Sequence, residues 1–119
     1  MKEFLAIYLG NPDSPRGRQW RALDDAIRQD RQVAGAKAWH AWMDAHKSAI
    51  VVTGGPLGKT RRADPAGITE TKNSMAAYVV VRAESHEAAA KLFENHPHFA
   101  IFPGESVEIM ECLPIPGRP

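Results

Sequence analysis

The sequence predicts an α+β domain with the split order βαββαβ, which folds as a ferredoxin-like, four-stranded antiparallel sheet with its helices on one face. Three observations predict this fold. Four short runs are rich in β-branched and aromatic residues, two segments carry apolar residues at helical spacing, and a polar connection rich in glycine and proline joins the middle two runs. At 119 residues, with 44% hydrophobic and 24% charged residues, the chain has the length and composition of one globular domain. We expect that domain to span residues 1–113, followed by a loose, proline-rich tail over residues 114–119.

The first strand is predicted over residues 4–8, which are all apolar or aromatic and are followed by turn-forming residues. A helical pattern comes next. It is carried by Trp20, Leu23 and Ile27, weakens around Gly35, and resumes with four residues at helical spacing, Trp39, Trp42, Met43 and His46. Because the phase of the pattern does not carry across Gly35, we expect two helical segments or one helix bent at that glycine.

Two strands and their connection follow the first helical region. Residues 50–53 predict the second strand, which Gly54 ends. Residues 57–75 contain little apolar sequence and predict a long, polar hairpin connection. Residues 77–81 predict the third strand most strongly, because nearly all of them are β-branched or aromatic.

A short helix and a fourth strand complete the predicted order. Ser85 is a suitable N-cap, and the apolar stripe after it stops before Pro97. Residues 107–112 predict the last strand, and Pro114 ends it.

Both faces of the predicted sheet are apolar. In the first strand Leu5 and Ile7 point to one face, while Phe4, Ala6 and Tyr8 point to the other. Helices can cover only one of these faces, and soluble monomers rarely tolerate an exposed apolar patch of this size. We therefore expect a homodimer in which the second faces meet, as in the dimeric α+β barrels.

Composition limits the classes of partner and the compartment. Fifteen Lys and Arg residues against fourteen Asp and Glu give a formal net charge of +1, so no global field attracts nucleic acid or an anionic membrane. The apolar run near the N-terminus is too short for a signal peptide or a membrane span. The single cysteine, Cys112, excludes an internal disulfide, and we expect it to be buried and inert. We predict a soluble, cytoplasmic protein.

Five segments of the chain resemble the YCII-related (DGPF-type) family. They are Gly54–Gly58, Glu70–Lys72, Tyr78–Val81, Ser85–Phe93 and Ser106–Met110, and the resemblance covers roughly residues 39–113 together with the first strand. It implies a small dimeric α+β barrel protein, in a family whose activities are mostly unassigned and in which a His/Asp pair in the cleft is proposed to be catalytic.

The chain departs from that family at the proposed catalytic pair. Counting back from Gly55 and Pro56, the helix position that often holds histidine in the family falls at Ala38. His40 is two residues away and so lies roughly 200° around the helix. The family's catalytic pair is therefore not carried over to this chain. His40 and Asp44, at i and i+4, are either a base oriented by a carboxylate or a weak surface contact.

The segment His96-Pro97-His98 is the strongest candidate site in the sequence. Proline favours an extended conformation at His96, so both imidazoles can project near the start of the last strand. Two side chains that titrate near neutral pH could bind a metal, transfer a proton or hold a carboxylate. We predict His96 or His98 as the catalytic acid or base, with Tyr78 positioning the substrate. The alternative is that the two histidines shape a loop and bond to the backbone.

Further residues are candidates for ligand binding. Trp39 and Trp42 could line a pocket beneath the helix, and Phe99 and Lys72 are also predicted to contact a ligand. Two histidines make an incomplete metal site, so no metal site is predicted. The basic residues 59–62 of the hairpin connection could hold an anion, although short basic runs are usually solvated.

Two hypotheses of function follow. The first is a small-molecule enzyme that acts without an organic cofactor and catalyses proton transfer or elimination on a small polar or aromatic metabolite. The second is a non-catalytic module that binds a small ligand or another protein.

Overall fold

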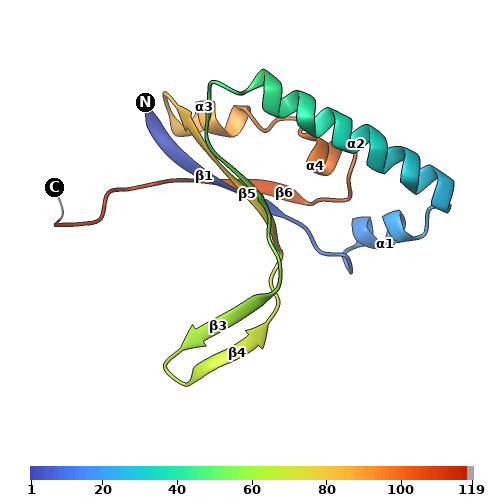
Figure 1. Ribbon diagram of the computed structural model, residues 1–119, viewed down its shortest axis with the longest axis horizontal. Coiled ribbons are helices and arrows are strands. Elements are labelled where there is room, and N and C mark those ends of the chain that lie inside the picture. The colour runs from blue at the N-terminus through green and yellow to red at the C-terminus, as the bar shows by residue number, and fades with distance from the viewer. Residues whose placement is uncertain (118–119) are drawn as a thin grey trace.

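The computed structural model describes residues 1–117 and contains six strands and four helices in that range. In chain order they are β1 (Lys2–Leu9), α1 (Pro15–Arg21), α2 (Asp25–Ala45), β2 (Ile50–Pro56), β3 (Thr60–Asp64), β4 (Gly67–Thr71), β5 (Met75–Ala83), α3 (His86–Lys91), α4 (Pro97–Ala100) and β6 (Ser106–Glu111). Figure 1 shows the main sheet with α2 running along it.

The main sheet has the order β2-β5-β1-β6, and every neighbouring pair is antiparallel. This is the order that two right-handed split βαβ units produce, with the first and last strands adjacent. The predicted four-stranded antiparallel sheet is confirmed.

One face of the sheet carries the core. Phe4, Ala6 and Tyr8 alternate along β1 and are buried, and their neighbours Val79 and Val81 on β5 are buried with them. Aromatic side chains from the helical segments pack onto this face. The opposite face, which the remaining residues of β1 and β5 supply, is half-buried. The described helices therefore cover one face, as the sequence predicts.

The first helical region breaks earlier than predicted. Helix α1 ends at Arg21, and α2 then runs without interruption through Gly35. The expected break at Gly35 is wrong because this glycine makes room for the ring of Phe102. A Cβ atom at position 35 would lie 2.5 Å from Cε2 of that ring. The apolar pattern weakens here because the ring of Phe102, from a distant part of the chain, packs against the backbone of Gly35.

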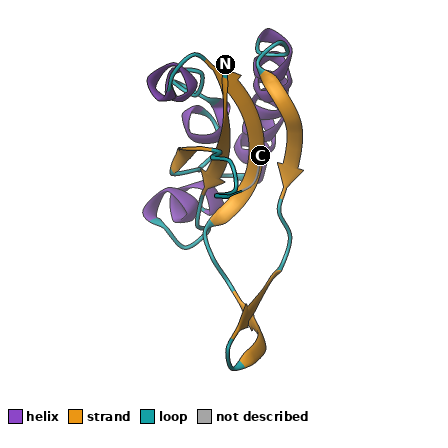
Figure 2. Cartoon of the chain, turned by 90° about the vertical axis from the view of Figure 1, so that its left-hand side faces the viewer, coloured by secondary structure: helices purple, strands orange, loops and turns teal. Residues whose placement is uncertain are grey.

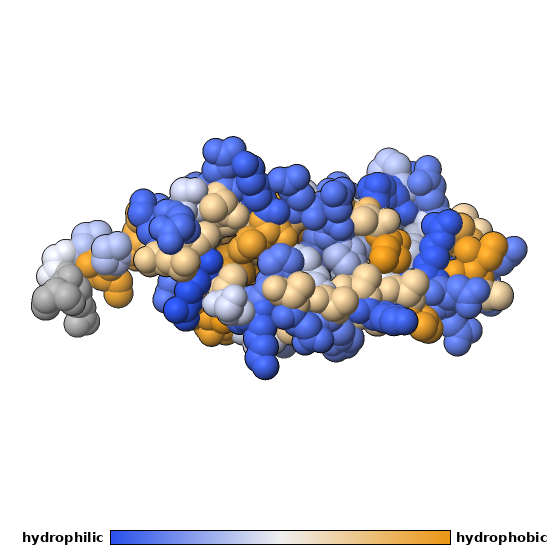
Figure 3. All heavy atoms as spheres, turned by 90° about the horizontal axis from the view of Figure 1, so that it is seen from above, coloured by the Kyte–Doolittle hydropathy of each residue, from blue (hydrophilic) through white to orange (hydrophobic). Residues whose placement is uncertain are grey.

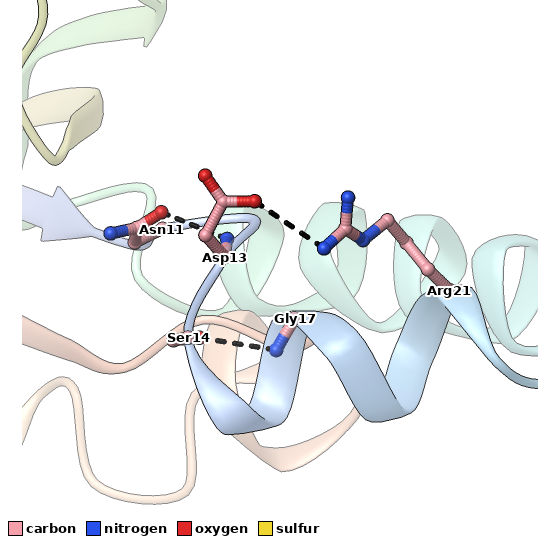
Figure 4. A network of polar contacts seen from close by, with 5 residues as sticks. All are labelled: Asn11, Asp13, Ser14, Gly17 and Arg21. Carbon is pink, nitrogen blue, oxygen red and sulfur yellow. Dashed lines mark hydrogen bonds and ion pairs between the residues drawn. The ribbon is translucent and has the colours of Figure 1, made fainter.

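A polar network marks the start of α1 (Figure 4). Oγ of Ser14 accepts a hydrogen bond from the Gly17 amide at 3.1 Å, which is a standard N-cap. The Asp13 amide donates to Oδ1 of Asn11 at 2.9 Å, and the Asp13 carboxylate meets Arg21 at 3.4 Å. The turn-forming residues that end the first strand thus also begin the first helix.

The predicted hairpin connection contains a second, two-stranded sheet. Strands β3 and β4 pair only with each other and project from the body of the molecule (Figures 1 and 2). This projection raises the radius of gyration to 16.4 Å, against about 14 Å for a compact chain of this length. Its basic residues form exposed ion pairs, Arg61 with Glu70 at 3.6 Å and Arg62 with Asp64 at 3.3 Å.

In the second half of the chain, most of the observed elements agree with the predicted ones. Ser85 caps α3 by accepting a hydrogen bond from the Ala88 amide at 3.1 Å. The expectation of a buried cysteine is wrong, because Cys112 follows the last residue of β6 and is exposed. Residues 114–117 form no helix or strand, and the end of the predicted tail, residues 118 and 119, lies outside the described residues.

The surface is mixed in character. On the face seen from above, hydrophilic side chains predominate and hydrophobic ones lie in separate patches between them (Figure 3). Within residues 1–117, no helix is both long and apolar enough to cross a membrane.

Candidate functional site

A cavity of about 500 Å³ lies between α2 and the main sheet. Its volume falls within the range of small-molecule sites in proteins. Helix α2 supplies one wall, β2 and β5 supply the other, and side chains from β1 and from the segment around α4 close the inner end. The lining residues are Tyr8, Ala36, Trp39, His40, Trp42, Met43, Thr53–Pro56, Ala76–Val79, His98 and Phe102.

Irregular pairing of β2 shapes the sheet wall of the cavity. The register between β2 and β5 shifts twice, between Ile50 and Val52 and again between Val52 and Gly55. Gly54 lies in the second irregular stretch with φ of 65°, and a Cβ atom there would lie 2.0 Å from the carbonyl oxygen of Tyr78. Only glycine fits this position. Such bulges bend a strand locally and often adjoin functional sites.

A hydrogen-bonded pair, Tyr8 and His96, lies at the inner end of the cavity. The Tyr8 hydroxyl, on β1, is 3.2 Å from Nε2 of His96, which is fully buried as the N-cap of α4. Nδ1 of His96 accepts a hydrogen bond from the His98 backbone amide at 2.9 Å. Because Nδ1 is an acceptor, the proton of the neutral ring is on Nε2 and is donated to the oxygen of Tyr8. The hydroxyl proton of Tyr8 therefore remains available to a molecule in the cavity.

Burial keeps both members of this pair neutral. Desolvation, together with smaller contributions from the nearby imidazoles of His98 and His46, lowers the pKa of His96 to about 4. Desolvation also raises the pKa of Tyr8 well above its ordinary value. At neutral pH the pair is thus an uncharged imidazole and an uncharged phenol.

His98 also lines the cavity, and its orientation is set by a backbone carbonyl. Nε2 of His98 lies 2.7 Å from the carbonyl oxygen of Leu9, so Nε2 carries a proton and donates it. Burial lowers the pKa of His98. The carbonyls of Leu9 and Ser106 oppose this effect, and the positive charge of Arg16 adds to it. The ring centroids of Tyr8 and His98 are 5.2 Å apart.

Two tryptophans from α2 enclose the pair. The rings of Trp39 and Trp42 lie with their centroids 4.6 Å and 4.7 Å from that of His96, both edge-on. Nε1 of Trp42 donates a hydrogen bond to the carbonyl oxygen of Leu92 at 2.8 Å, which fixes the ring while it lines the cavity. These contacts exclude water from His96 on the side of the helix.

The structure brings five of the seven residues that the sequence singles out to the cavity. His98, Trp39, Trp42 and Tyr78 line it, and His96 lies directly behind Tyr8. His96 and His98 also bond to the backbone, as the alternative interpretation of this segment expects.

Tyr78 lines the cavity beside the irregular stretch of β2, although its partner Ile7 on β1 points to the face of the sheet opposite to that of Tyr8. The other two candidates are placed elsewhere. Lys72 lies beside the projecting hairpin and is exposed. Phe99 does not line the cavity because α4 turns it toward a separate hollow beside β6. Lys72 and Phe99 therefore do not line this cavity, and their role as ligand contacts stays a prediction.

Sequence reasoning missed the central residue of the site, Tyr8. Its signal was a lone polar group on the otherwise apolar inner face of β1, because a buried tyrosine hydroxyl needs a partner. Phe102 and Met43 were missed as lining residues, and His40 lies at the cavity although its helical face was not placed there in advance. His40 and Asp44 form no hydrogen bond or ion pair within residues 1–117.

The cavity wall contains no aspartate, glutamate, lysine or arginine side chain. Its polar groups are hydroxyls, imidazoles and backbone, and the rest is aromatic or aliphatic. In the described part of the chain, no group of three or more metal-ligating side chains is assembled. Such a wall suits an uncharged, planar molecule, since a buried ion would lack a counter-charge.

Comparison with known proteins supports the fold. No family model matches the chain, and no curated protein matches it. Among solved structures, it is similar to the 5-chloro-2-hydroxyhydroquinone dehydrochlorinase of Burkholderia phenoliruptrix, determined in complex with 2,5-dihydroxybenzoquinone. The match has 21% sequence identity and a TM-score of 0.50, and it covers 91% of this chain and 90% of the other. The likeness extends over nearly the whole of both chains and shows a common fold.

Proposed function

We propose that this protein is a small-molecule enzyme that catalyses proton transfer or elimination on a small, uncharged aromatic molecule, without an organic cofactor. The observation that carries the proposal is the buried pair of Tyr8 and His96 at the inner end of an aromatic cavity. A phenol whose oxygen accepts a hydrogen bond from a fixed imidazole has its own proton directed toward the ligand.

Tyr8 is the proposed hydrogen-bond donor to the substrate. A donor fixed in a dry cavity stabilises negative charge that develops on a substrate oxygen, and removal of one such donor typically lowers turnover by about a hundredfold or more. The raised pKa of Tyr8 keeps its proton in place at neutral pH. His96 has no place in the cavity wall and is a positioning residue that holds the Tyr8 hydroxyl.

His98 is the proposed base. Its ring lines the cavity beside Tyr8, and with the proton on Nε2 its other nitrogen, Nδ1, can accept a proton from the substrate. In an elimination, Nδ1 of His98 takes a proton from the substrate, and the electron pair left behind forms a new double bond as the bond to the leaving group breaks and that group departs as an anion. Tyr8 stabilises the negative charge that develops on the substrate oxygen during this step. His40 is the second lining imidazole and is the alternative base.

Hydroquinones and catechols are the first ligands to test. They are planar and uncharged at neutral pH, and they carry the hydroxyl groups that Tyr8 and His98 would contact. The solved structure with a similar fold belongs to a dehydrochlorinase bound to a benzoquinone, which supports starting with this class.

The resemblance to the YCII-related family and the half-buried second face of the sheet support a homodimer of the dimeric α+β barrel type. Leu5, Ile7 and Leu9 of β1 point to that face and are not fully covered. We propose that a second copy covers them and that the protein works in the cytoplasm. Light scattering at micromolar concentration tests the dimer, and a monomer would contradict it.

The enzyme is tested with the variants Tyr8→Phe, His96→Asn and His96→Gln. Ligands are first found by the thermal shift that hydroquinones, catechols and their chlorinated forms cause in the wild type. For a chlorinated hydroquinone that binds, chloride release measures elimination. We expect Tyr8→Phe to keep the ligand-induced shift and to lower chloride release by about a hundredfold.

The two His96 variants separate positioning from folding. Asparagine places its oxygen where Nδ1 accepts the His98 amide but loses the contact with Tyr8, whereas glutamine reaches Tyr8 with an N–H group. If His96 positions Tyr8, His96→Gln keeps more activity than His96→Asn. Unchanged chloride release in Tyr8→Phe would contradict the proposed chemistry.

A non-catalytic binding module is the second candidate. The backbone bonds of His96 and His98 favour it, because both imidazoles then serve the fold. Thermal shifts without turnover for any compound of the panel, unaffected by Tyr8→Phe, would support this candidate over the enzyme.

A further inference from the structure

A second cavity, of about 310 Å³, lies where α1, the first half of α2 and the segment after α4 meet. Its lining residues are Arg16, Gln19, Trp20, Leu23, Arg31 and Ala100–Pro103. It differs from the first cavity in charge, because two arginines and no carboxylate line it.

The arginines of this region fall into two groups. Those outside the cavity wall include Arg21, which pairs with Asp13 at 3.4 Å, and Arg28, which pairs with Asp25. The lining arginines, Arg16 and Arg31, have no carboxylate partner within residues 1–117. Arg18 of α1 has no carboxylate partner in that range either, but it lies outside the cavity wall. Two of the unpaired arginines of this region therefore line one cavity.

A hydrogen bond to the backbone positions the guanidinium of Arg16. One of its N–H groups donates to the carbonyl oxygen of Phe99, at the end of α4, and its other donors are unused in the described chain. Arg31, on α2, also lines the cavity and has no hydrogen-bond partner in residues 1–117. Two arginines that line one hollow suit a carboxylate, which accepts hydrogen bonds on both oxygens.

Aromatic rings complete the wall. The rings of Trp20 and Phe102 have their centroids 5.9 Å apart and are inclined by 47°. Phe102 also lines the first cavity and lies 6.2 Å from the ring of Trp39, so one side chain forms the partition between the two cavities. An apolar ring in the second cavity would pack on these aromatic faces.

We propose that this second cavity binds a small aromatic carboxylate, with the carboxylate between Arg16 and Arg31 and the ring against Trp20 and Phe102. The arginines favour the carboxylate of such a ligand, and the aromatic wall favours its ring. A simple anion would leave the aromatic wall in water, and a neutral aromatic molecule would leave two cations without a partner. This site is separate from the one proposed for catalysis, which takes an uncharged molecule.

Isothermal titration of benzoate into the full chain tests the site, with benzamide and acetate as matched ligands. Benzamide has the same shape without the charge, and acetate has the charge without the ring. We expect benzoate to bind at least tenfold more tightly than either, and Arg16→Gln and Arg31→Gln each to weaken it about tenfold, which corresponds to the loss of one charge-assisted hydrogen bond.

Arg18→Gln is the matched control, because Arg18 belongs to α1 but does not line the cavity. We expect it to leave benzoate affinity unchanged, and Arg31→Gln to leave unchanged the thermal shift caused by a neutral hydroquinone. Equal weakening by Arg18→Gln would mean that benzoate responds only to a general positive potential. Equal affinity for benzamide, or no binding of benzoate at millimolar concentration, would overturn the proposal. Because the hydroquinone response belongs to the first cavity, either proposal can fail without the other.

Discussion

Protonation of His96 should be a main cause of acid destabilisation in this protein. The ring is fully buried among Trp39, Trp42 and Phe93, and it is held neutral between the Tyr8 hydroxyl and the His98 amide. A second proton would convert Nδ1 from an acceptor into a donor that faces another donor. The protein must therefore unfold locally or strain this contact before the ring can be charged.

The magnitude follows from the two pKa values. The pKa of His96 is lowered to about 4 in the folded protein, against about 6.5 in an unfolded chain. A folded pKa below the unfolded one means that the unfolded state binds more protons. The stabilisation is thus fully present above about pH 6.5 and is lost as the pH falls toward 4. The difference amounts to roughly 3 kcal/mol, most of it lost by pH 4.5.

Urea unfolding followed by tryptophan fluorescence at pH 7.5 and 4.5 measures this loss. The variants His96→Asn and His96→Gln both remove the titrating ring but keep different halves of its contacts. Each variant is less stable than the wild type at pH 7.5, so the informative quantity is the change in unfolding free energy between the two pH values. We expect that change to be smaller by roughly 2–3 kcal/mol in both variants.

If His96→Asn and His96→Gln show the same change in unfolding free energy between the two pH values, their common difference from the wild type reports the proton on His96 and not a contact that one of them has lost. Carboxylates also titrate below pH 5 but do so equally in all three proteins. If the wild type and both variants lose the same free energy between pH 7.5 and 4.5, His96 is not held neutral by the fold, and the assignment of its proton to Nε2 loses its support.

Three further predictions concern backbone space and exposure. Gly54→Ala should lower the free energy of unfolding by about 2 kcal/mol or more, because φ is positive at this position and a Cβ atom would lie 2.0 Å from the Tyr78 carbonyl oxygen. Urea unfolding measures the loss, and a value under about 0.5 kcal/mol would show that β2 relaxes freely. Gly35→Ala should gain helix propensity of about 1 kcal/mol yet cost more by overpacking against Phe102, so a rise in Tm would contradict the close contact. Cys112 should react fully with a thiol reagent in the native protein, and a thiol that reacts only in denaturant would contradict its exposure.

Much of the fold could be predicted from local patterns. The inner face of β1, the β-branched run of β5 and the Ser85 cap are each contained in a few consecutive residues. The order of those elements then leaves few sheet topologies that obey right-handed connections. The break in the helical region was misplaced because Gly35 reports a long-range contact with Phe102 and not a local interruption.

The candidate site was predicted less completely. The His96-Pro97-His98 segment could be singled out by composition, and the pairing of its first ring with Tyr8 could not, because 88 residues separate the two partners along the chain. The exclusion of Phe99 and Lys72 from the cavity likewise depends on how α4 turns and where the hairpin projects.

The sequence by itself determined the four strands of the main sheet, the apolar character of the face of β1 that carries Phe4 and Tyr8, and that two histidines flank a proline before the last strand. Those properties follow from side-chain period and backbone preference, which act over a few residues. Only the tertiary structure decided that Tyr8 meets His96, that burial keeps both neutral, and that two arginines line a second cavity. These depend on distances between elements and on the exclusion of water, and neither is defined until the chain has packed.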